Sequence, residues 1–92
     1  MPSPDGYNCV QFVKKKRPDI GTGYGSLVEK LSKATIKEPK RGLIGITPEG
    51  WSGHLVYVLE VKEKTIIVEE SNYKRGFITK REIPKSLVIG YL

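Results

Sequence analysis

The first third of the chain carries apolar residues at the spacing of short helices. Over 9–16 they recur with a helical period, Asn8 in front of them is a typical N-cap, and Pro18 is incompatible with further helix. A Ser-x-x-Glu pattern at 26–29 matches the capping box that opens a helix. The apolar face predicted for this second helix consists of Leu27, Val28, Leu31 and Ala34. Two short helices are therefore expected, and Cys9 begins the first of them.

Beyond the break at 39–42 the apolar period changes to the alternation of strands. The predicted strands are 43–47, 54–61, 65–70, 76–83 and a weaker 87–92, joined by short turns that include 48–50 and 62–64. Consecutive strands with short links normally pair antiparallel. The pattern predicts an α+β fold in which the N-terminal helices pack on an antiparallel sheet of five to six strands, a meander or half-barrel.

Strand alternation also assigns the polar residues near strand ends to a face. In the strand predicted at 65–70, Glu70 has the parity of the apolar positions, and Asn72 continues it. Glu69 has the opposite parity and is expected to face solvent. His54 opens the preceding strand, on the same face as Val56. Glu70 is therefore preferred over Glu69 as a site residue.

Length and composition fit one domain that spans residues 1–92. A chain of 92 residues, of which 38% are apolar and spread over the whole length, can form one core but not two. Its start has neither the basic nor the apolar region of a signal peptide. Its longest apolar run, 55–59, is far below the roughly 20 residues of a membrane span. We therefore expect a soluble protein without a membrane segment.

The chain is basic. Sixteen Lys and Arg against ten Asp and Glu give a net charge of +6, which favours attraction to nucleic acid, anionic lipid or an anionic cell wall. The densest basic run, 14–17, is interpreted as a solvated helix end whose cations complement the helix dipole. The other basic residues are scattered and do not alternate with aromatic residues as in an RNA-reading strand. Nucleic acid is therefore not the expected partner.

The chain has a single cysteine, Cys9, and a single histidine, His54. One cysteine cannot form an intramolecular disulfide, and one Cys, one His and two Asp are too few for the usual structural zinc sites. A lone cysteine is either a small buried hydrophobe, which composition alone favours, or a nucleophile. Its place at a helix start favours the nucleophile, because the dipole and the unpaired N–H groups there stabilise a thiolate and an oxyanion.

A cysteine nucleophile requires a base, and His54 is the only imidazole of the chain. A third group must fix the orientation of that imidazole, and Glu70 is the candidate. Taken separately, a lone histidine is more often a surface or satisfied core residue, and an acidic pair at a strand end is more often solvated. The combination with Cys9 is what favours a catalytic interpretation.

Three segments of the chain together carry a family pattern. They are Asn-Cys-Val-Gln-Phe-Val-Lys-Lys-Lys-Arg-Pro-Asp at 8–19, Gly-His-Leu-Val-Tyr-Val at 53–58 and Glu-Ser-Asn-Tyr at 70–73. In this order they resemble the CHAP family of cysteine- and histidine-dependent amidohydrolases and peptidases, over nearly the whole chain. The resemblance implies a papain-like fold with Cys9 as nucleophile and His54 as general base and later general acid. It also implies that Glu70 orients His54 and that Asn72 supports this arrangement.

By this resemblance the chain is expected to be an endolysin-like peptidoglycan hydrolase, acting as an N-acetylmuramoyl-L-alanine amidase or as an endopeptidase. Peptidoglycan is then the substrate, anionic wall polymers are a further partner, and a monomer acts at the bacterial cell wall. No separate wall-binding module fits in 92 residues. Without a signal peptide, the chain suits a phage lysin released at lysis or an excised domain of a secreted protein. The aromatic candidates to line a substrate groove are Tyr24, Trp51 and Tyr73.

The chain also departs from the family pattern. It is short, and it lacks before Cys9 the acidic cluster that some relatives use for calcium, so no metal or other cofactor is expected. The second oxyanion donor is unmatched, and Tyr7 and Asn8 are candidates only by nearness. Two alternatives stay open. One is a non-catalytic basic β-rich module that binds cell wall or nucleic acid, and the other is an inactive CHAP-like domain.

Overall fold

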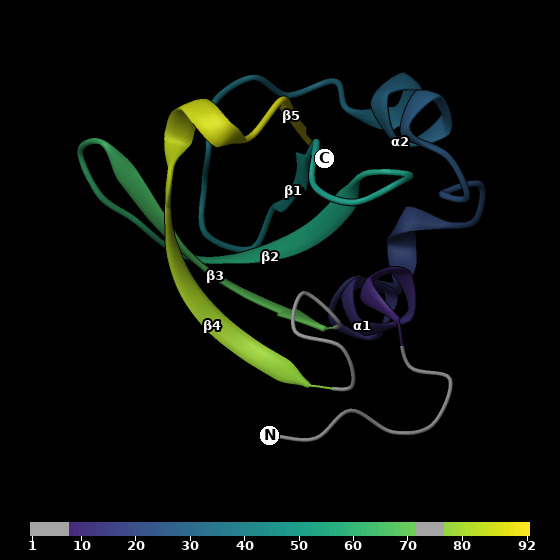
Figure 1. Cartoon of the computed structure of the whole chain (residues 1–92), viewed down its shortest axis with the longest axis horizontal. Helices are drawn as coiled ribbons and strands as arrows, with labels where there is room; N and C mark the ends of the chain where they lie inside the picture. The colour runs from purple at the N-terminus through teal and green to yellow at the C-terminus, as the bar shows by residue number, and fades with distance from the viewer. Residues whose placement is uncertain (1–7, 72–76) are drawn as a thin grey trace.

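A computed structural model describes residues 8–71 and 77–92 of the protein. Its α-helices and strands, in chain order, are α1 (Cys9–Lys16), α2 (Leu27–Lys33), β1 (Ile44–Thr47), β2 (His54–Val61), β3 (Thr65–Ser71), β4 (Ile78–Pro84) and β5 (Gly90–Tyr91). Short 3-10 turns, η1 (Pro18–Ile20) and η2 (Lys85–Leu87), follow α1 and β4. Both helices precede the sheet in sequence, as predicted, and Figure 1 shows them at the right of the view with the curved sheet beside them.

The five strands of the described residues form one antiparallel sheet in the order β4-β3-β2-β1-β5. β1 to β4 are a meander of consecutive neighbours, and β5 returns to pair with β1, where Gly45 lies opposite Tyr91. The predicted α+β class and the antiparallel meander are therefore confirmed. The strand predicted at 87–92 is shorter than expected, because η2 includes its first residue and only Gly90–Tyr91 form β5.

One face of the sheet is covered by α1, and the other by the chain that returns to β5. Under α1 the buried apolar side chains are Phe12, Val13, Tyr24, Ile44, Ile46 and Leu55. On the opposite face they are Val56, Val58, Ile66, Val68, Ile83 and Tyr91, with Leu87 and Val88 packed against them. Full burial of one such aliphatic or aromatic side chain contributes about 1.5–3 kcal/mol. Because alternate residues of β2 are anchored in the two clusters, the direction in which its first residue, His54, projects is fixed.

The apolar face predicted for α2 is wrong at two of its four positions. Val28 is 77% exposed and Leu31 is 39% exposed, whereas Leu27 and Ala34 do pack against the core. The side chain that α2 buries instead is Lys30, at 2% exposure. Burial of this lysine is tolerated because its ammonium donates to two backbone carbonyls, which offset much of the cost of removing an amine from water.

The basic run 14–17 does more than complement the helix dipole. Lys16 Nζ lies 3.1 Å from a carboxylate oxygen of Glu69 on β3, and Arg17 donates to the backbone carbonyl of Leu92 at 2.9 Å. Glu69, predicted to face solvent, has a side chain that is only 16% exposed beside Lys16, so that prediction is wrong. The run ties the end of α1 to the sheet.

Gly53, next to His54, is expected to tolerate no side chain. Its φ is +77°, and a Cβ there would lie 2.7 Å from Leu27 Cδ1 and 3.3 Å from the Thr47 carbonyl oxygen. We expect Gly53→Ala to lower the free energy of unfolding by about 2–3 kcal/mol, through a disfavoured φ and a clash with α2.

The control is Gly50→Ala, since Gly50 has a φ of +74° but no heavy atom within 4 Å of an added Cβ. This variant has the backbone strain alone and should lose only about 1 kcal/mol. Urea denaturation compares the two proteins. Equal losses would show that contact with Leu27 is not what limits position 53.

Candidate functional site

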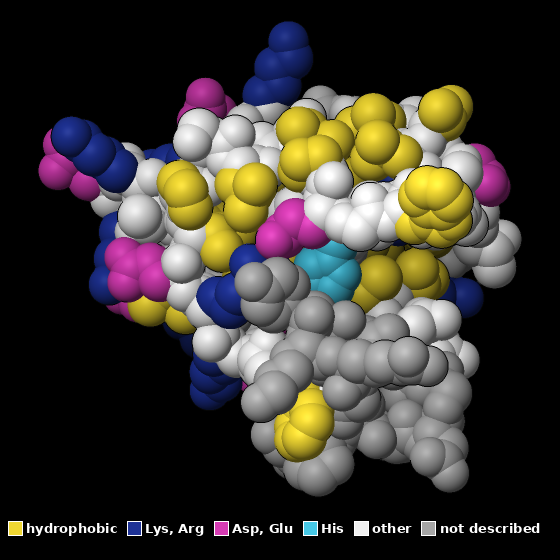
Figure 2. Space-filling view, viewed as in Figure 1, with side chains coloured by type: hydrophobic (Ala, Val, Ile, Leu, Met, Phe, Trp, Pro, Cys, Tyr) yellow, Lys and Arg dark blue, Asp and Glu magenta, His cyan; other side chains and the backbone are white. Residues whose placement is uncertain are grey.

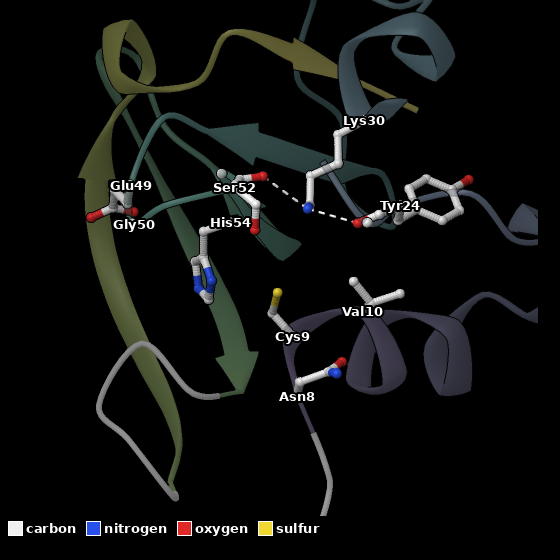
Figure 3. Close-up of a pocket in the computed structure, with 11 residues that line it drawn as sticks. Asn8, Cys9, Val10, Tyr24, Lys30, Glu49, Gly50, Ser52 and His54 are labelled. Carbon is white, nitrogen blue, oxygen red and sulfur yellow. Dashed lines mark hydrogen bonds between the residues drawn. The ribbon is translucent and has the colours of Figure 1, made fainter. Parts of the chain in front are cut away.

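Cys9 is the first residue of α1, and its position follows from a complete capping box. Asn8 Oδ1 accepts a hydrogen bond from the Gln11 amide at 2.9 Å, and Gln11 Oε1 accepts one from the Asn8 amide at 2.8 Å. The cap fixes the start of the helix, so the half-buried thiol lies at the positive end of the helix dipole. Figure 3 shows the sulfur pointing from the start of α1 into the space between His54 and Lys30.

His54 opens β2 and is buried opposite Thr47 of β1. Its Nε2 lies 2.9 Å from Glu70 Oε1. The ring is also hydrogen bonded to Cys9, which leaves Nδ1 for the sulfur. Figure 2 shows one edge of the imidazole at the surface, beside acidic and basic side chains. The structure thus brings together three of the predicted site residues, Cys9, His54 and Glu70, in one row from α1, β2 and β3.

Glu70 is fully buried, as its parity on β3 predicts. Its carboxylate is shared between His54 and Arg81, whose Nε lies 2.9 Å from Oε2 and whose Nη2 lies 2.7 Å from Oε1. Arg81 also binds Glu49, in the loop between β1 and β2, through Nη2 at 2.7 Å and Nη1 at 3.1 Å. Neither Arg81 nor Glu49 is predicted from the sequence. The sequence did contain one signal for Arg81: it stands two residues before the apolar Ile83, and therefore on the same face of the predicted strand.

Burial and hydrogen bonding set the charges of Cys9 and His54. Burial raises the pKa of the Cys9 thiol, but hydrogen bonds to His54 and from the Leu55 amide outweigh it and bring the pKa below its ordinary value of 9.0. Burial likewise opposes the charged form of His54, but hydrogen bonds to Cys9 and Glu70 raise its pKa to about 9. Both shifts favour a thiolate–imidazolium pair, the reactive state of a cysteine nucleophile.

Glu70 stays ionised within this network. Burial raises the pKa of its carboxyl, but hydrogen bonds from His54 and Arg81 outweigh burial and leave the pKa below its usual value. Burial also opposes the charge of Arg81, yet its contacts with Glu70 and Glu49 raise the pKa of the guanidinium. A permanently charged carboxylate at Nε2 orients the imidazolium and stabilises its charge without donating a proton.

An open pocket of about 490 Å³ lies in front of Cys9 and His54. The other lining residues labelled in Figure 3 are Asn8, Val10, Tyr24, Lys30, Glu49, Gly50 and Ser52. Of the aromatic residues predicted to line a groove, Tyr24 does so, and Trp51 is fully exposed in the loop that forms one wall. Tyr73 lies outside the described residues. The opening lets an amide group reach the sulfur from solvent.

The remaining predictions concern the residues and groups around Cys9, His54 and Glu70. Asn72 and Tyr7 lie outside the described residues, and Asn8 uses its side-chain oxygen to cap α1. Within 8–71 and 77–92, no group of three His, Cys, Asp or Glu side chains is arranged to hold a metal ion. In the same part of the chain, no helix has the length and apolar character that crossing a membrane requires.

Replacing His54 by glutamine is expected to shift the pH dependence of Cys9 alkylation. In the wild-type protein the rate with iodoacetamide should reach half its maximum below pH 9.0, because the pKa of Cys9 is lowered. In His54→Gln the imidazolium that lowers the pKa of Cys9 is gone, so the half-maximal pH should rise above that of the wild type. Mass spectrometry after timed quenching measures the rates, with the unfolded chain in guanidinium as the reference. A half-maximal pH that is the same in both folded proteins argues against the ion pair.

No protein-family model matches this chain, and no curated protein matches it either. The candidate site therefore depends on the geometry of Cys9, His54 and Glu70 and on the segments that carry them. Those segments are the start of α1, the start of β2 and the end of β3, which meet at the pocket.

Proposed function

We propose that this chain is a cysteine-dependent amidase or endopeptidase of the CHAP type, with a papain-like fold, that cleaves amide bonds in bacterial peptidoglycan. The observation that carries the proposal is the row of hydrogen bonds from buried Glu70 to His54 and from His54 to Cys9. Buried charges with shifted pKa values are costly in a module that only binds, whereas they serve an activated nucleophile. The three segments that resemble the family contribute these same side chains.

In the proposed reaction, the sulfur electron pair of Cys9 forms a bond to the amide carbonyl carbon, and the carbonyl π electrons move onto oxygen. Amide N–H groups at the start of α1 stabilise this oxyanion. The C–N bond then breaks, and the imidazolium of His54 gives its proton to the leaving amine. Water, deprotonated by neutral His54, hydrolyses the thioester and restores the thiolate and the imidazolium. Glu70 keeps the imidazole in place throughout.

The proposed substrate class follows from the family resemblance. The bond cut is the N-acetylmuramoyl-L-alanine amide or a bond within the stem or cross-bridge peptide. The net charge of +6 supports contact with anionic wall polymers. In this proposal the protein acts as a monomer at the bacterial cell wall.

The test is to incubate the purified protein with suspended cell walls of several bacteria, to follow turbidity and to count newly exposed amino groups. Clearing with release of amino groups supports the proposal, and mass spectrometry of the fragments identifies the bond. Walls that retain the protein in a pull-down but release no amines favour the non-catalytic wall-binding module instead. Salt-dependent binding to DNA without thiol reactivity favours the nucleic-acid alternative.

A further inference from the structure

Lys30 of α2 is a buried lysine in the wall of the pocket. It is 2% exposed, and its ammonium donates hydrogen bonds to the backbone carbonyls of Tyr24, at 2.7 Å, and Ser52, at 2.9 Å. Figure 3 shows the side chain reaching from α2 toward the space beside Cys9, with its nitrogen between the two carbonyls. These two bonds hold the nitrogen in place and tie the loop between β1 and β2 to α2.

Among the described residues, the ammonium of Lys30 has one N–H left and no carboxylate beside it. An ammonium group has three donors, and the two carbonyls take two of them. In the part of the chain that the structure describes, no Asp or Glu oxygen lies within 4.0 Å of this nitrogen. A buried cation without a counter-charge is costly. A negative group in the pocket is therefore expected to interact with it.

The charges around the pocket sum to zero when Cys9 and His54 form a thiolate–imidazolium pair. The cations are Lys30, His54 and Arg81, and the anions besides Cys9 are Glu49 and Glu70. Arg81 binds both carboxylates, and His54 binds Glu70. Burial raises the pKa of Cys9, and the charge of Lys30, after the contacts with His54, is among the causes that bring it down.

We propose that Lys30 is a further catalytic residue, the fixed positive charge that stabilises the reacting negative charge beside Cys9. This role rests on the function proposed above. During attack the sulfur pair becomes the S–C bond and the carbonyl π pair moves onto oxygen, so the negative charge changes place and the net charge of the pocket is unchanged. The remaining N–H of Lys30 donates to that oxygen and is the second oxyanion donor, for which sequence suggested only Tyr7 and Asn8.

The other role open to Lys30 is a purely structural tie between α2 and the loop at Ser52. The two roles differ in their effect on an anion placed beside the sulfur. A tie holds the loop for any ligand, whereas a catalytic ammonium favours an anionic ligand over a neutral one of the same size. Iodoacetate and iodoacetamide form such a pair. In both reactions the Cys9 thiolate displaces iodide and forms an S–C bond, and only iodoacetate brings a carboxylate to that position.

The experiment measures the ratio of the alkylation rate with iodoacetate to that with iodoacetamide, in the wild-type protein and in Lys30→Met. Methionine retains an unbranched stem but has neither the charge nor a donor. The control is Lys33→Met, because the ammonium of Lys33, on the same helix, lies 5.3 Å from the centroid of the Tyr24 ring and does not line the pocket. Lys30→Gln is a second variant that keeps a donor for one carbonyl, in case Lys30→Met does not fold.

We expect the ratio to fall about tenfold in both Lys30 variants, since the attraction between two unit charges at close range is lost. The Lys33→Met ratio should stay at the wild-type value. On cell walls the Lys30 variants should lose kcat with little change in KM, because the ground-state amide carries no charge. An unchanged alkylation ratio in a Lys30 variant with a native circular dichroism spectrum overturns the proposal.

Alkylation needs no hydrolysis, so this test does not depend on the proposed function. If the protein leaves every wall intact but the alkylation ratio falls in the Lys30 variants, the hydrolase assignment is wrong and the anion-stabilising role of Lys30 stands. If the wild-type protein cuts walls but the alkylation ratio is unchanged in the Lys30 variants, the hydrolase assignment stands and Lys30 is only a structural tie.

Discussion

Replacing Cys9 by alanine should reduce the release of amino groups from cell walls to the uncatalysed background. Cys9 is the only cysteine of the chain, and alanine leaves His54 with no hydrogen-bonded group to activate. The expected loss of rate is about 10⁴-fold or more, the scale on which removal of a nucleophile acts in hydrolases with a covalent intermediate. Turbidity and amine counts on the same walls measure it.

A second variant, Cys9→Ser, serves as a matched comparison. It keeps the size of the side chain and a partner for His54, but a hydroxyl is a far weaker acid than a thiol, so we expect a loss nearly as large. Both variants should melt within about 5 °C of the wild type, because Cys9 is half-buried and contributes one sulfur atom to packing. If the alanine variant still releases amines, the cysteine mechanism is wrong.

Local patterns are sufficient to predict the elements that carry the site. Asn8 caps α1 because its side-chain oxygen accepts a hydrogen bond from the amide of Gln11, three residues later. The alternation of β3 puts Glu70 in the core, where apolar neighbours two and four residues earlier determine the face. Both features depend on residues within one turn or one strand, so a sequence pattern contains them.

Contacts between distant segments are not contained in such patterns. A helical-period rule assigns Lys30 to solvent. In the folded chain its ammonium donates to the carbonyl of Ser52, 22 residues away, because the loop between β1 and β2 lies against α2. Arg81 likewise binds Glu49, 32 residues before it, only in the assembled sheet. The surface that a helix meets decides which of its stripes is buried, which is why the predicted face of α2 is partly wrong.

Glu70→Ala should be the most destabilising substitution in the site. It leaves Arg81 with one carboxylate and removes the acceptor for Nε2 of His54. Removal of one partner from a buried ion pair costs about 3–5 kcal/mol, because the other charge stays behind unpaired. Arg81 keeps Glu49, so we expect the lower end, about 3 kcal/mol, which lowers the melting temperature by roughly 12–24 °C in a domain of this size.

The control for this loss of stability is Glu82→Ala, on β4. Glu82 forms an exposed ion pair with Lys62 at 3.4 Å. Exposed pairs contribute little to stability, so the melting temperature of this variant should stay near that of the wild type. Comparable losses of melting temperature in the two variants would mean that the buried network stabilises the fold no more than an exposed ion pair does.

A double variant, Glu70→Leu with Arg81→Met, separates stability from catalysis. Of the charged partners left behind, Glu49 is partly exposed and keeps its hydrogen bond from Thr47, and His54 keeps its hydrogen bond to Cys9. Most of the lost stability should therefore return, because apolar pairs of similar volume commonly replace buried ion pairs without loss. Amine release should stay about 10³-fold or more below the wild type, because His54 still lacks the carboxylate that orients it. A double variant that is both stable and active would mean that Glu70 serves the fold alone.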